Sequence, residues 1–334
     1  MTSALPSASP AVPLVLSGFG PVGQAFLEKI GAQQQRGIAV TVIRGQASET
    51  TLGPGSGVPD RASWHPLAQL EATLDRTGAG VLVQALPSSP EAHPRAVDEA
   101  ITALRRGVHV VTATKSHLLT HWRDLEQAAR TGGSRIRISG ATGAALPTAD
   151  LARLGVRGLD CHALRACPNG TSTFVLDRIS DGGSLKEAVR EARRCGIAEA
   201  DTSADLSGSD AATKARLLAG LLWDWDVARI QIETEAIDEG TVELAAAAAR
   251  SGRRLRAVAS ASLDRPMTVT VRLERVGPGD PFFHITGPEK AMTFHCPDAG
   301  DITVQGGRSS PTGAALAMVK DVLNLVEGNA TGFH

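Results

Sequence analysis

Four acidic residues and a lysine stand close together in the second half of the chain, and these residue types can together bind an ammonium group and move a proton. In order they are Glu199, Asp201, Asp205, Asp210 and Lys214. With Ser209 as the N-cap of a helix, Asp210 lies in the first turn and shares a helix face with Lys214, four residues later. The helix N-terminus disfavours a positive charge and the carboxylate favours it, and such opposed effects can adjust a lysine for proton transfer. The alternative interpretation is a capped helix with a surface ion pair.

A glycine-rich turn near the start of the chain has the spacing that binds a dinucleotide. Gly18-Phe-Gly20-Pro-Val-Gly23 follows an apolar strand expected over residues 12–17 and opens a helix expected over residues 21–30. In such a turn the first glycine makes the bend, the second lets the backbone approach a pyrophosphate, and the third lets helix and strand pack closely. The alternative is a turn without a ligand, but its place between strand and helix favours cofactor binding. The expected cofactor contacts are Gly18, Gly20, Pro21, Val22 and Gly23.

The second strand, expected over residues 38–43, ends at a basic residue. A fold that selects NAD usually places Asp or Glu there to bind the ribose 2′-hydroxyl. Arg44 occupies the position instead and suits a 2′-phosphate. The sequence therefore favours NADP over NAD, with Arg44 as the residue that reads the phosphate; the alternative is a solvated arginine at a strand end. Residues 47–61 are rich in Gly, Pro and Ser and are expected to form a loop.

Two further apolar strands carry site candidates at their carboxyl ends. Residues 80–86 run into a turn at Leu86 and Pro87, and the next strand ends at Thr112, shortly before Lys115. In open parallel sheets, ligands collect at the carboxyl ends of the strands, so we expect both ends to line the cofactor. Lys115 is expected to reach the reacting groups, with an ordinary loop lysine as the alternative.

The alternation of strands and helices over residues 12–148 predicts an α/β Rossmann-type nucleotide-binding domain with a parallel sheet. Residues 149–306 mix helices with extended segments that lack this alternation, which predicts a second, α+β domain with a mostly antiparallel sheet. A last helix over residues 311–326 has apolar side chains at helical spacing, Leu316 among them. Residues 307–328 are therefore expected to return to the first domain.

Composition and charge exclude several classes of partner. The 334 residues are 42% hydrophobic and 21% charged, with a formal net charge of −1, which is typical of a globular chain with two domains. No basic stripe with interleaved aromatics and no apolar run of transmembrane length is present, so we expect neither a nucleic acid nor a membrane as a partner. The four cysteines fit no zinc spacing, which indicates reduced thiols in a cytoplasmic protein without a metal site. Residues 1–11 lack the basic segment of a signal peptide and are expected to be disordered.

Taken together, the motifs resemble the homoserine dehydrogenase family over nearly the whole chain. The glycine turn resembles the family's cofactor loop, and Thr112-Ala-Thr-Lys115 resembles its Thr-Ala-Asn-Lys element. Ala144-Ala-Leu-Pro147 resembles the family's Gly-Gly-Ile/Leu-Pro turn. Asn169-Gly-Thr171 is its Asn-Gly-Thr motif, and the segment from Glu199 to Lys214 matches its substrate segment.

The resemblance implies hydride transfer that interconverts L-aspartate 4-semialdehyde and L-homoserine, with NADP as cofactor and NAD as the alternative. It implies that Gly170 and Thr171 lie between nicotinamide and substrate. It also makes residues 149–306 a substrate-binding and dimerisation domain, so that the protein is expected to be a homodimer acting on a small amino-acid substrate.

The resemblance further assigns roles to the acidic segment and to both lysines. Glu199 and Asp205 would bind the α-ammonium group of the substrate. Lys115 and Lys214 would be the acid/base lysines near the reacting oxygen, with Asp210 orienting Lys214. Hydride delivered to a carbonyl leaves charge on oxygen, which a nearby ammonium stabilises and then protonates.

Three departures from the family pattern leave the substrate open. Thr114 replaces the usual Asn, Ser139 replaces a Glu associated with a monovalent cation, and Arg308 lies in a segment that is Gly-Pro-Gly-Ala-Gly in the family. The chain stops at His334, which is expected to make it a short form without the C-terminal regulatory domain. One alternative is a paralogous oxidoreductase acting on another amino-acid aldehyde or alcohol. A second alternative is a cofactor-binding sensor without catalysis.

Overall fold

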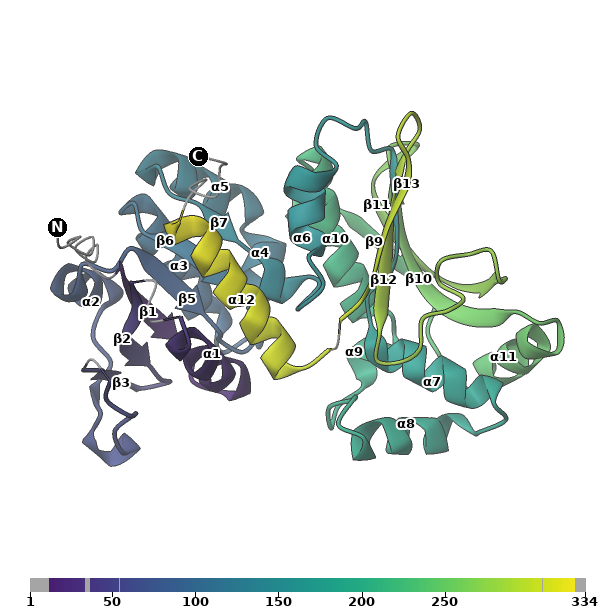
Figure 1. Ribbon diagram of the computed structural model, residues 1–334, viewed down its shortest axis with the longest axis horizontal. Coiled ribbons are helices and arrows are strands. Elements are labelled where there is room, and N and C mark those ends of the chain that lie inside the picture. The colour runs from purple at the N-terminus through teal and green to yellow at the C-terminus, as the bar shows by residue number, and fades with distance from the viewer. Residues whose placement is uncertain (1–11, 34–36, 54, 308, 328–334) are drawn as a thin grey trace, which may run out of the picture. The chain divides into compact units, whose positions relative to one another are not determined.

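A computed structural model describes residues 12–33, 37–53, 55–307 and 309–327, and the chain divides into two compact units (Figure 1). The first comprises the described residues up to His117, then His121–Ile138, and those from Ala315 onward. The second comprises Leu118–Thr120 and Ser139–Ala314. The main part of the second unit therefore starts at Ser139, earlier than the domain boundary expected at residue 148. The expectations for residues 1–11 and for Arg308 lie outside the described residues.

The first unit contains a mostly parallel sheet with strand order β4-β3-β2-β1-β5-β6-β7. Its strands are β1 (Val12–Ser17), β2 (Ile38–Arg44), β3 (Ser48–Thr51), β4 (His65–Pro66), β5 (Val81–Gln84), β6 (His109–Thr112) and β7 (Ile136–Arg137). Ser17 pairs with Arg44 on one side and Gln84 on the other, so the carboxyl ends of β1, β2 and β5 are aligned. β2 lies on one side of β1 and β5 lies on the other, so the strand order reverses at β1. Such a switch point is where α/β sheets bind ligands. The antiparallel strand β3 lies within residues 47–61, which were predicted to form a loop. No element was predicted where β4 lies.

Helices cover this sheet: α1 (Pro21–Gly31), α2 (Leu70–Thr77), α3 (His93–Arg105), α4 (Ser116–Thr120), α5 (Trp122–Gly132) and α12 (Pro311–Val326), with a short 3₁₀ turn, η2, at Arg61–Ser63. Figure 1 shows α12, in yellow, among the elements of the first unit. Its buried Met318 and Val322 share a core cluster with Phe26 of α1 and Leu14 of β1. The last helix therefore packs on the first sheet. Leu316 does not belong to the buried face; it is 47% exposed, because it lies on the opposite side of the helix.

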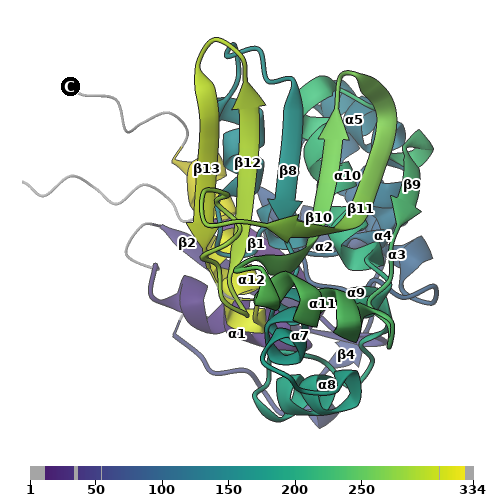
Figure 2. The same ribbon diagram turned by 90° about the vertical axis from the view of Figure 1, so that its right-hand side faces the viewer.

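The second unit contains a sheet with strand order β13-β12-β8-β10-β11-β9 (Figure 2). Its strands are β8 (Ala163–Cys167), β9 (Gln231–Thr234), β10 (Arg254–Ser262), β11 (Arg265–Val276), β12 (Lys290–Cys296) and β13 (Gly300–Gly306). β9 and β11 run parallel, and the other neighbouring pairs are antiparallel. The predicted fold class, a Rossmann-type unit followed by a mostly antiparallel α+β unit, is confirmed.

The helical segments of this unit are α6 (Thr148–Asp150), α7 (Gly170–Ser180), α8 (Leu185–Arg194), α9 (Ser203–Leu206), α10 (Ser209–Trp223) and α11 (Thr241–Arg250), with short turns η3 (Ser139–Ala141), η4 (Leu151–Gly155) and η5 (Val227–Arg229). α10 packs on the sheet through alanines, among them Ala212 and Ala215, which share a cluster with Val269 of β11. Small side chains at this contact let the helix backbone approach the strands closely. The N-termini of α7 and α10 therefore have fixed positions above the sheet.

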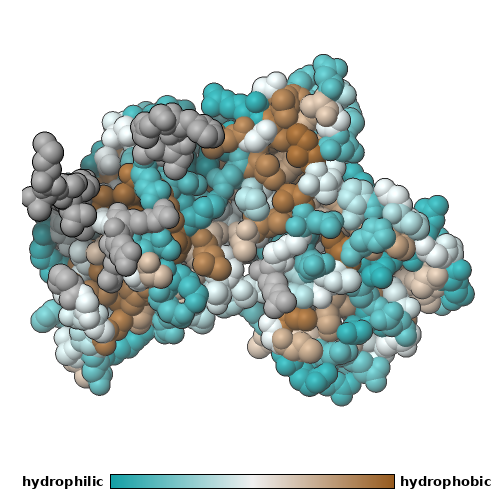
Figure 3. Space-filling model, in the orientation of Figure 1, coloured by the Kyte–Doolittle hydropathy of each residue, from teal (hydrophilic) through white to brown (hydrophobic). Residues whose placement is uncertain are grey.

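Apolar side chains are also visible on the surface of the second unit, near α6 (Figure 3). Leu154 of η4 is 61% exposed, and Leu151, Leu221 and Leu222 are partly buried against the cluster formed by η4, α10 and β12. Within the part of the chain that the structure describes, no helix combines the length and hydropathy needed to cross a membrane.

Candidate functional site

The glycine turn lies at the switch point of the first sheet. Its three positions differ in why they hold glycine. Gly18 has φ +97°, and a Cβ there would lie 2.4 Å from the carbonyl oxygen of Ala85 at the end of β5. A Cβ on Gly23 would lie 2.1 Å from the carbonyl oxygen of Gly18. A Cβ on Gly20 would have no heavy atom within 4 Å apart from those of its two chain neighbours. The fold itself requires Gly18 and Gly23, whereas Gly20 leaves open space at the N-terminus of α1, where a phosphate group fits.

The carboxyl ends of β5 and β6 are joined by side-chain hydrogen bonds. Thr114 is buried, and its hydroxyl donates to the carbonyl oxygen of Leu86 (2.8 Å). The Thr114 amide donates to the hydroxyl of Thr112 (3.0 Å), and the Lys115 amide donates to Ser88 Oγ (2.9 Å). The structure therefore places the half-buried Lys115 beside the turn that contains Leu86 and Pro87. Thr114, which departs from the family pattern, holds the two loops together.

Arg44 does not have the role that the sequence predicted. Its side chain is 3% exposed and forms ion pairs with Glu49 (2.7 Å) and Glu99 (3.2 Å). It also donates to the hydroxyl of Thr73 and to the carbonyl oxygen of Ala68. Because these acceptors occupy the guanidinium inside the unit, Arg44 is a structural cation and not a reader of a 2′-phosphate.

Replacing Arg44 with leucine is expected to destabilise the protein by about 2–3 kcal/mol, because two buried carboxylates would lose their shared cation, while Glu49 keeps Arg76 and Glu99 keeps Arg95. Urea denaturation of the purified variant measures this change. Arg106→Ala is the control, since its ion pair with Asp75 is exposed and is worth at most ~1 kcal/mol. Unchanged stability combined with a selective loss of NADPH affinity would restore the original interpretation of Arg44.

In the second unit, two of the four predicted carboxylates, Asp205 and Asp210, come together with Lys214, whereas Glu199 and Asp201 are exposed. Lys214 is 8% exposed, and its Nζ donates to Asp210 Oδ2 (2.5 Å) and to the carbonyl oxygen of Pro168 (3.1 Å). The side-chain amide of Asn169 donates to Asp205 Oδ1 (2.6 Å) and to Asp210 Oδ2 (2.8 Å). The end of β8, α9 and the first turn of α10 therefore meet in one cluster. The exposed ion pair that was the alternative interpretation is excluded by this burial.

The electrostatics of the cluster affect Asp205 most clearly. Burial raises the pKa of Asp205 above its ordinary value, whereas the hydrogen bond from Asn169 lowers it. The charge of Asp210 raises this pKa, Lys214 lowers it, and the exposed Glu199 raises it further. The site thus holds excess negative charge next to one cation, which suits a second cation such as a substrate ammonium group.

Two other predicted residues lie at the start of α7. Thr171 is buried, and its hydroxyl donates to the carbonyl oxygen of Ile197 (3.2 Å). A Cβ on Gly170 would lie 2.5 Å from the carbonyl oxygen of Pro288, so packing alone requires glycine there. Both residues therefore border the cluster through Asn169, to which they are joined in sequence.

The predicted N-cap of α10 is wrong by one residue. Gly208 is the cap, with φ +78°, and Ser209 is the first helical residue. A Cβ at Gly208 would lie 3.1 Å from Val271 Cγ1, so both the backbone angle and the strand below favour glycine. Asp210 still lies in the first turn, and its pairing with Lys214 is unaffected.

Asn169 is a site residue that belongs to the Asn-Gly-Thr motif but had no predicted role of its own. Its position directly before an apolar helix could have indicated helix capping, because Asn is a preferred N-cap residue. The structure confirms the cap: Asn169 Oδ1 accepts from the amide of Ser172 (2.9 Å). Its amide nitrogen contacts two carboxylates and so joins three elements. No pattern in the neighbouring sequence indicates these contacts.

Ser139, where the family pattern has Glu, is buried in η3. Its carbonyl oxygen accepts from the hydroxyl of Thr142 (3.2 Å). Among the described ranges, no three or more His, Cys, Asp or Glu side chains are grouped so as to hold a metal ion.

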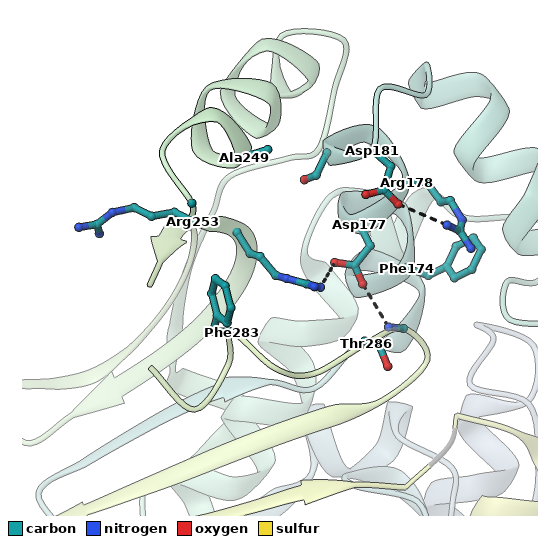
Figure 4. A pocket seen from close by; sticks show the side chains of 12 residues that line it. Phe174, Asp177, Arg178, Asp181, Ala249, Arg253, Phe283 and Thr286 are labelled. Atoms are coloured by element: carbon teal, nitrogen blue, oxygen red, sulfur yellow. Dashed lines mark hydrogen bonds and ion pairs between the residues drawn. The ribbon is translucent and has the colours of Figure 1, made fainter. Parts of the chain in front are cut away.

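A cavity of about 460 Å³ in the second unit lies apart from these residues (Figure 4). Its lining includes Asp177, Arg178, Asp181 and Arg254. Asp177 pairs with Arg254 (3.2 Å). Arg178 pairs with Asp181 (3.4 Å), as Figure 4 shows. None of the residues predicted from the sequence to form the site lines this cavity.

A dinucleotide turn on one unit and a buried lysine–carboxylate cluster on the other define an NAD(P)-dependent oxidoreductase. Comparison with known families agrees with this class. A model described as homoserine dehydrogenase matches residues 147–323, and one described as homoserine dehydrogenase, NAD binding domain, matches residues 18–139. The chain belongs to the homoserine dehydrogenase family.

Curated relatives and solved structures show the same similarity. An NAD(+)-dependent homoserine dehydrogenase of Pseudomonas canavaninivorans is 26% identical, over 93% of this chain and 95% of that protein. A putative homoserine dehydrogenase of Archaeoglobus fulgidus has the same fold, with a TM-score of 0.78 and 24% identity over 93% of this chain and 98% of the other. A hyperthermophilic archaeal homoserine dehydrogenase in complex with NADPH has a TM-score of 0.77 and 21% identity, over 94% and 97% of the two chains.

Proposed function

We propose that the protein interconverts L-aspartate 4-semialdehyde and L-homoserine, with NADP as the preferred cofactor. The observation that carries the proposal is the buried cluster in which Lys214, Asp210, Asn169 and Asp205 are joined by hydrogen bonds. One ammonium donor beside two carboxylates matches a substrate that has both a reacting oxygen and an α-ammonium group. The curated relatives with homoserine dehydrogenase names support this substrate.

Lys214 is proposed to act on the reacting oxygen. When hydride reaches the aldehyde carbon, the C=O π electrons move to oxygen, and the Lys214 ammonium stabilises this charge and then donates a proton to form the alcohol. Asp210 accepts a hydrogen bond from Nζ and so fixes the direction of the ammonium group. Lys115, at the end of the first sheet, is proposed as the second acid/base lysine.

Asp205 and Glu199 are proposed to bind the α-ammonium group of the substrate. Asp205 must be ionised for this task, and its raised pKa makes binding sensitive to acid. A bound ammonium adds a positive charge to a group of carboxylates, which favours their ionised forms and strengthens the pairing. Gly170 and Thr171, next to Asn169, would border the substrate.

The first unit is proposed to hold the cofactor at its switch point. The open space at Gly20 and the N-terminus of α1 fit a pyrophosphate, with Gly18, Pro21, Val22 and Gly23 forming the turn around it. The loops that contain Leu86, Pro87 and Thr112 border the same end of the sheet. Bound NADPH supplies the hydride in the reductive direction.

Arg61 is proposed to replace Arg44 as the reader of the 2′-phosphate. It is exposed, donates to the carbonyl oxygen of Phe19 (3.2 Å) within the glycine turn, and lies over the rings of Phe19 and Trp64. We expect Arg61→Gln to raise the KM for NADPH by roughly 10-fold, the effect of losing one charged hydrogen bond, and to leave the KM for NADH nearly unchanged. Initial rates with both cofactors measure this, and equal changes for NADPH and NADH would contradict the assignment.

The function is tested by following NADPH absorbance with aspartate semialdehyde, and NADP reduction with homoserine. Turnover of neither compound would reject the assignment. A second candidate is a paralogue that acts on another amino-acid aldehyde, which the residues Thr114 and Ser139 motivate. Higher kcat/KM for a different aldehyde in the same assay would favour it, and cofactor binding without turnover of any aldehyde would favour a sensor.

The family resemblance also supports a homodimer located in the cytoplasm. Light scattering of the purified protein tests the oligomeric state, and a monomer at working concentration would contradict a dimer.

A further inference from the structure

Asn169 lies at the centre of the cluster and uses the full hydrogen-bonding capacity of its amide. It is 4% exposed. Its nitrogen donates to Asp205 and Asp210, and its Oδ1 accepts from the amide (2.9 Å) and the hydroxyl (3.1 Å) of Ser172. Because carboxylates only accept and a backbone amide only donates, the amide has a single orientation that satisfies every partner.

We infer that Asn169 is a positioning residue that assigns the two carboxylates to separate tasks, Asp210 to the catalytic lysine and Asp205 to the substrate ammonium group. This inference rests on the proposed function of the same cluster. The same amide nitrogen directs one N–H to each carboxylate, so each acidic group has a donor of its own at a fixed position. Without a donor between them, both carboxylates would compete for Lys214, and Asp205 would be less available to the substrate.

The side chain also fixes these groups relative to each other. Asn169 caps α7, Asp205 lies in α9, and Asp210 lies in the first turn of α10. Pro168, the preceding residue, accepts from Lys214 Nζ through its carbonyl oxygen (3.1 Å). The same two-residue segment therefore holds the lysine through its backbone and the carboxylates through its side chain.

The charges in the cluster predict how the pH dependence of kcat/KM changes when the Asn169 amide is removed. The groups that face Asp205 are Asp210, Lys214, Glu199 and Asn169, and the hydrogen bond from Asn169 is the main influence that lowers its pKa. Removing the donor leaves burial and two carboxylates to raise the pKa of Asp205 further. Since the ionised form binds the ammonium group, the acid limb of the kcat/KM profile should move to higher pH.

Asn169→Ser and Asn169→Asp separate this role from helix capping. Ser and Asp cap helices as well as Asn does, so both variants keep an acceptor for the amide of Ser172. Neither offers two N–H donors to the carboxylates, and Asp adds a third negative charge. We expect Asn169→Ser to lower kcat/KM for the amino-acid substrate roughly 10- to 100-fold with a thermal midpoint near that of the wild type. Asn169→Asp should lower kcat/KM more, and its thermal midpoint should fall because a third carboxylate is buried beside two others.

Ser184→Ala is the control, because it removes the cap of α8, where the Ser184 side chain contacts Glu187 and neither Asp205 nor Asp210, and it should leave kcat/KM unchanged. Wild-type kcat/KM and an unshifted acid limb in both Asn169 variants would show that the residue only caps the helix. Failure of both variants to fold would also overturn the inference. Fluorescence titration with NADPH and thermal denaturation check folding in each case.

A measurement without substrate keeps the inference separate from the proposed function. Carboxyl ¹³C NMR titration gives the pKa of Asp205, assigned with Asp205→Asn. We expect a higher pKa in Asn169→Ser than in the wild type, and an unchanged value would contradict the inference. Absence of homoserine turnover in the wild-type protein would reject the proposed substrate, whereas the NMR result would still decide the role of Asn169.

Discussion

Lys214→Met should lower kcat for aldehyde reduction by at least about 100-fold, which is the usual effect of removing an acid/base group. Methionine keeps an unbranched side chain of similar length, so the apolar surface around the stem stays filled. What is lost is the ammonium group that donates to Asp210 and to the carbonyl oxygen of Pro168. Steady-state rates with saturating NADPH and aldehyde measure the change.

The matched control is Lys186→Met, because Lys186 is an exposed lysine of α8 in the same unit. It should have wild-type kcat. If Lys214→Met also turned over at the wild-type rate, the ammonium of Lys214 would have no part in catalysis, even with the family assignment intact.

Gly20→Val should weaken NADPH binding by at least about 100-fold and leave the stability of the protein nearly unchanged. The added side chain meets no heavy atom of the chain within 4 Å of its Cβ position, so the fold has room for it. It projects into the space at the N-terminus of α1 that the pyrophosphate would occupy, and several charged hydrogen bonds would be lost. Fluorescence titration with NADPH measures the affinity, and thermal denaturation measures the stability.

Gly31→Val provides the comparison, since Gly31 at the other end of α1 also has open space around its Cβ position. It should bind NADPH as the wild type does. Equal NADPH affinity in Gly20→Val and Gly31→Val would mean that the cofactor does not approach this turn.

Much of the first unit could be predicted from sequence because its signals are local. The strands of the parallel sheet are short apolar runs bounded by turns, and Gly18 and Gly23 are required by contacts within the turn itself. Strands β3 and β4 were missed because Ser48–Thr51 is polar and the surrounding residues are rich in Gly and Pro. β3 pairs with β2 and β4 pairs with β3, and no local pattern reveals this pairing.

The errors at the site have the same origin. Arg44 stands at the expected strand end, but its direction is decided by Glu49 and Glu99, of which the second lies on α3, far along the chain. The spacing of Asp210 and Lys214 predicted their contact correctly, because one helix contains both. The role of Asn169 depends on three elements meeting, so only the folded structure shows it.

The packing of α12 has a consequence for how the protein is made. Met318 and Val322, near the far end of the chain, complete the core around Phe26 and Leu14 of the first sheet. A ribosome that has released only the first half of the chain therefore leaves this apolar surface uncovered, whereas the second unit has all of its strands and helices before α12 emerges. The nucleotide-binding half is thus expected to mature last, and a fragment that ends near Ile138 should aggregate.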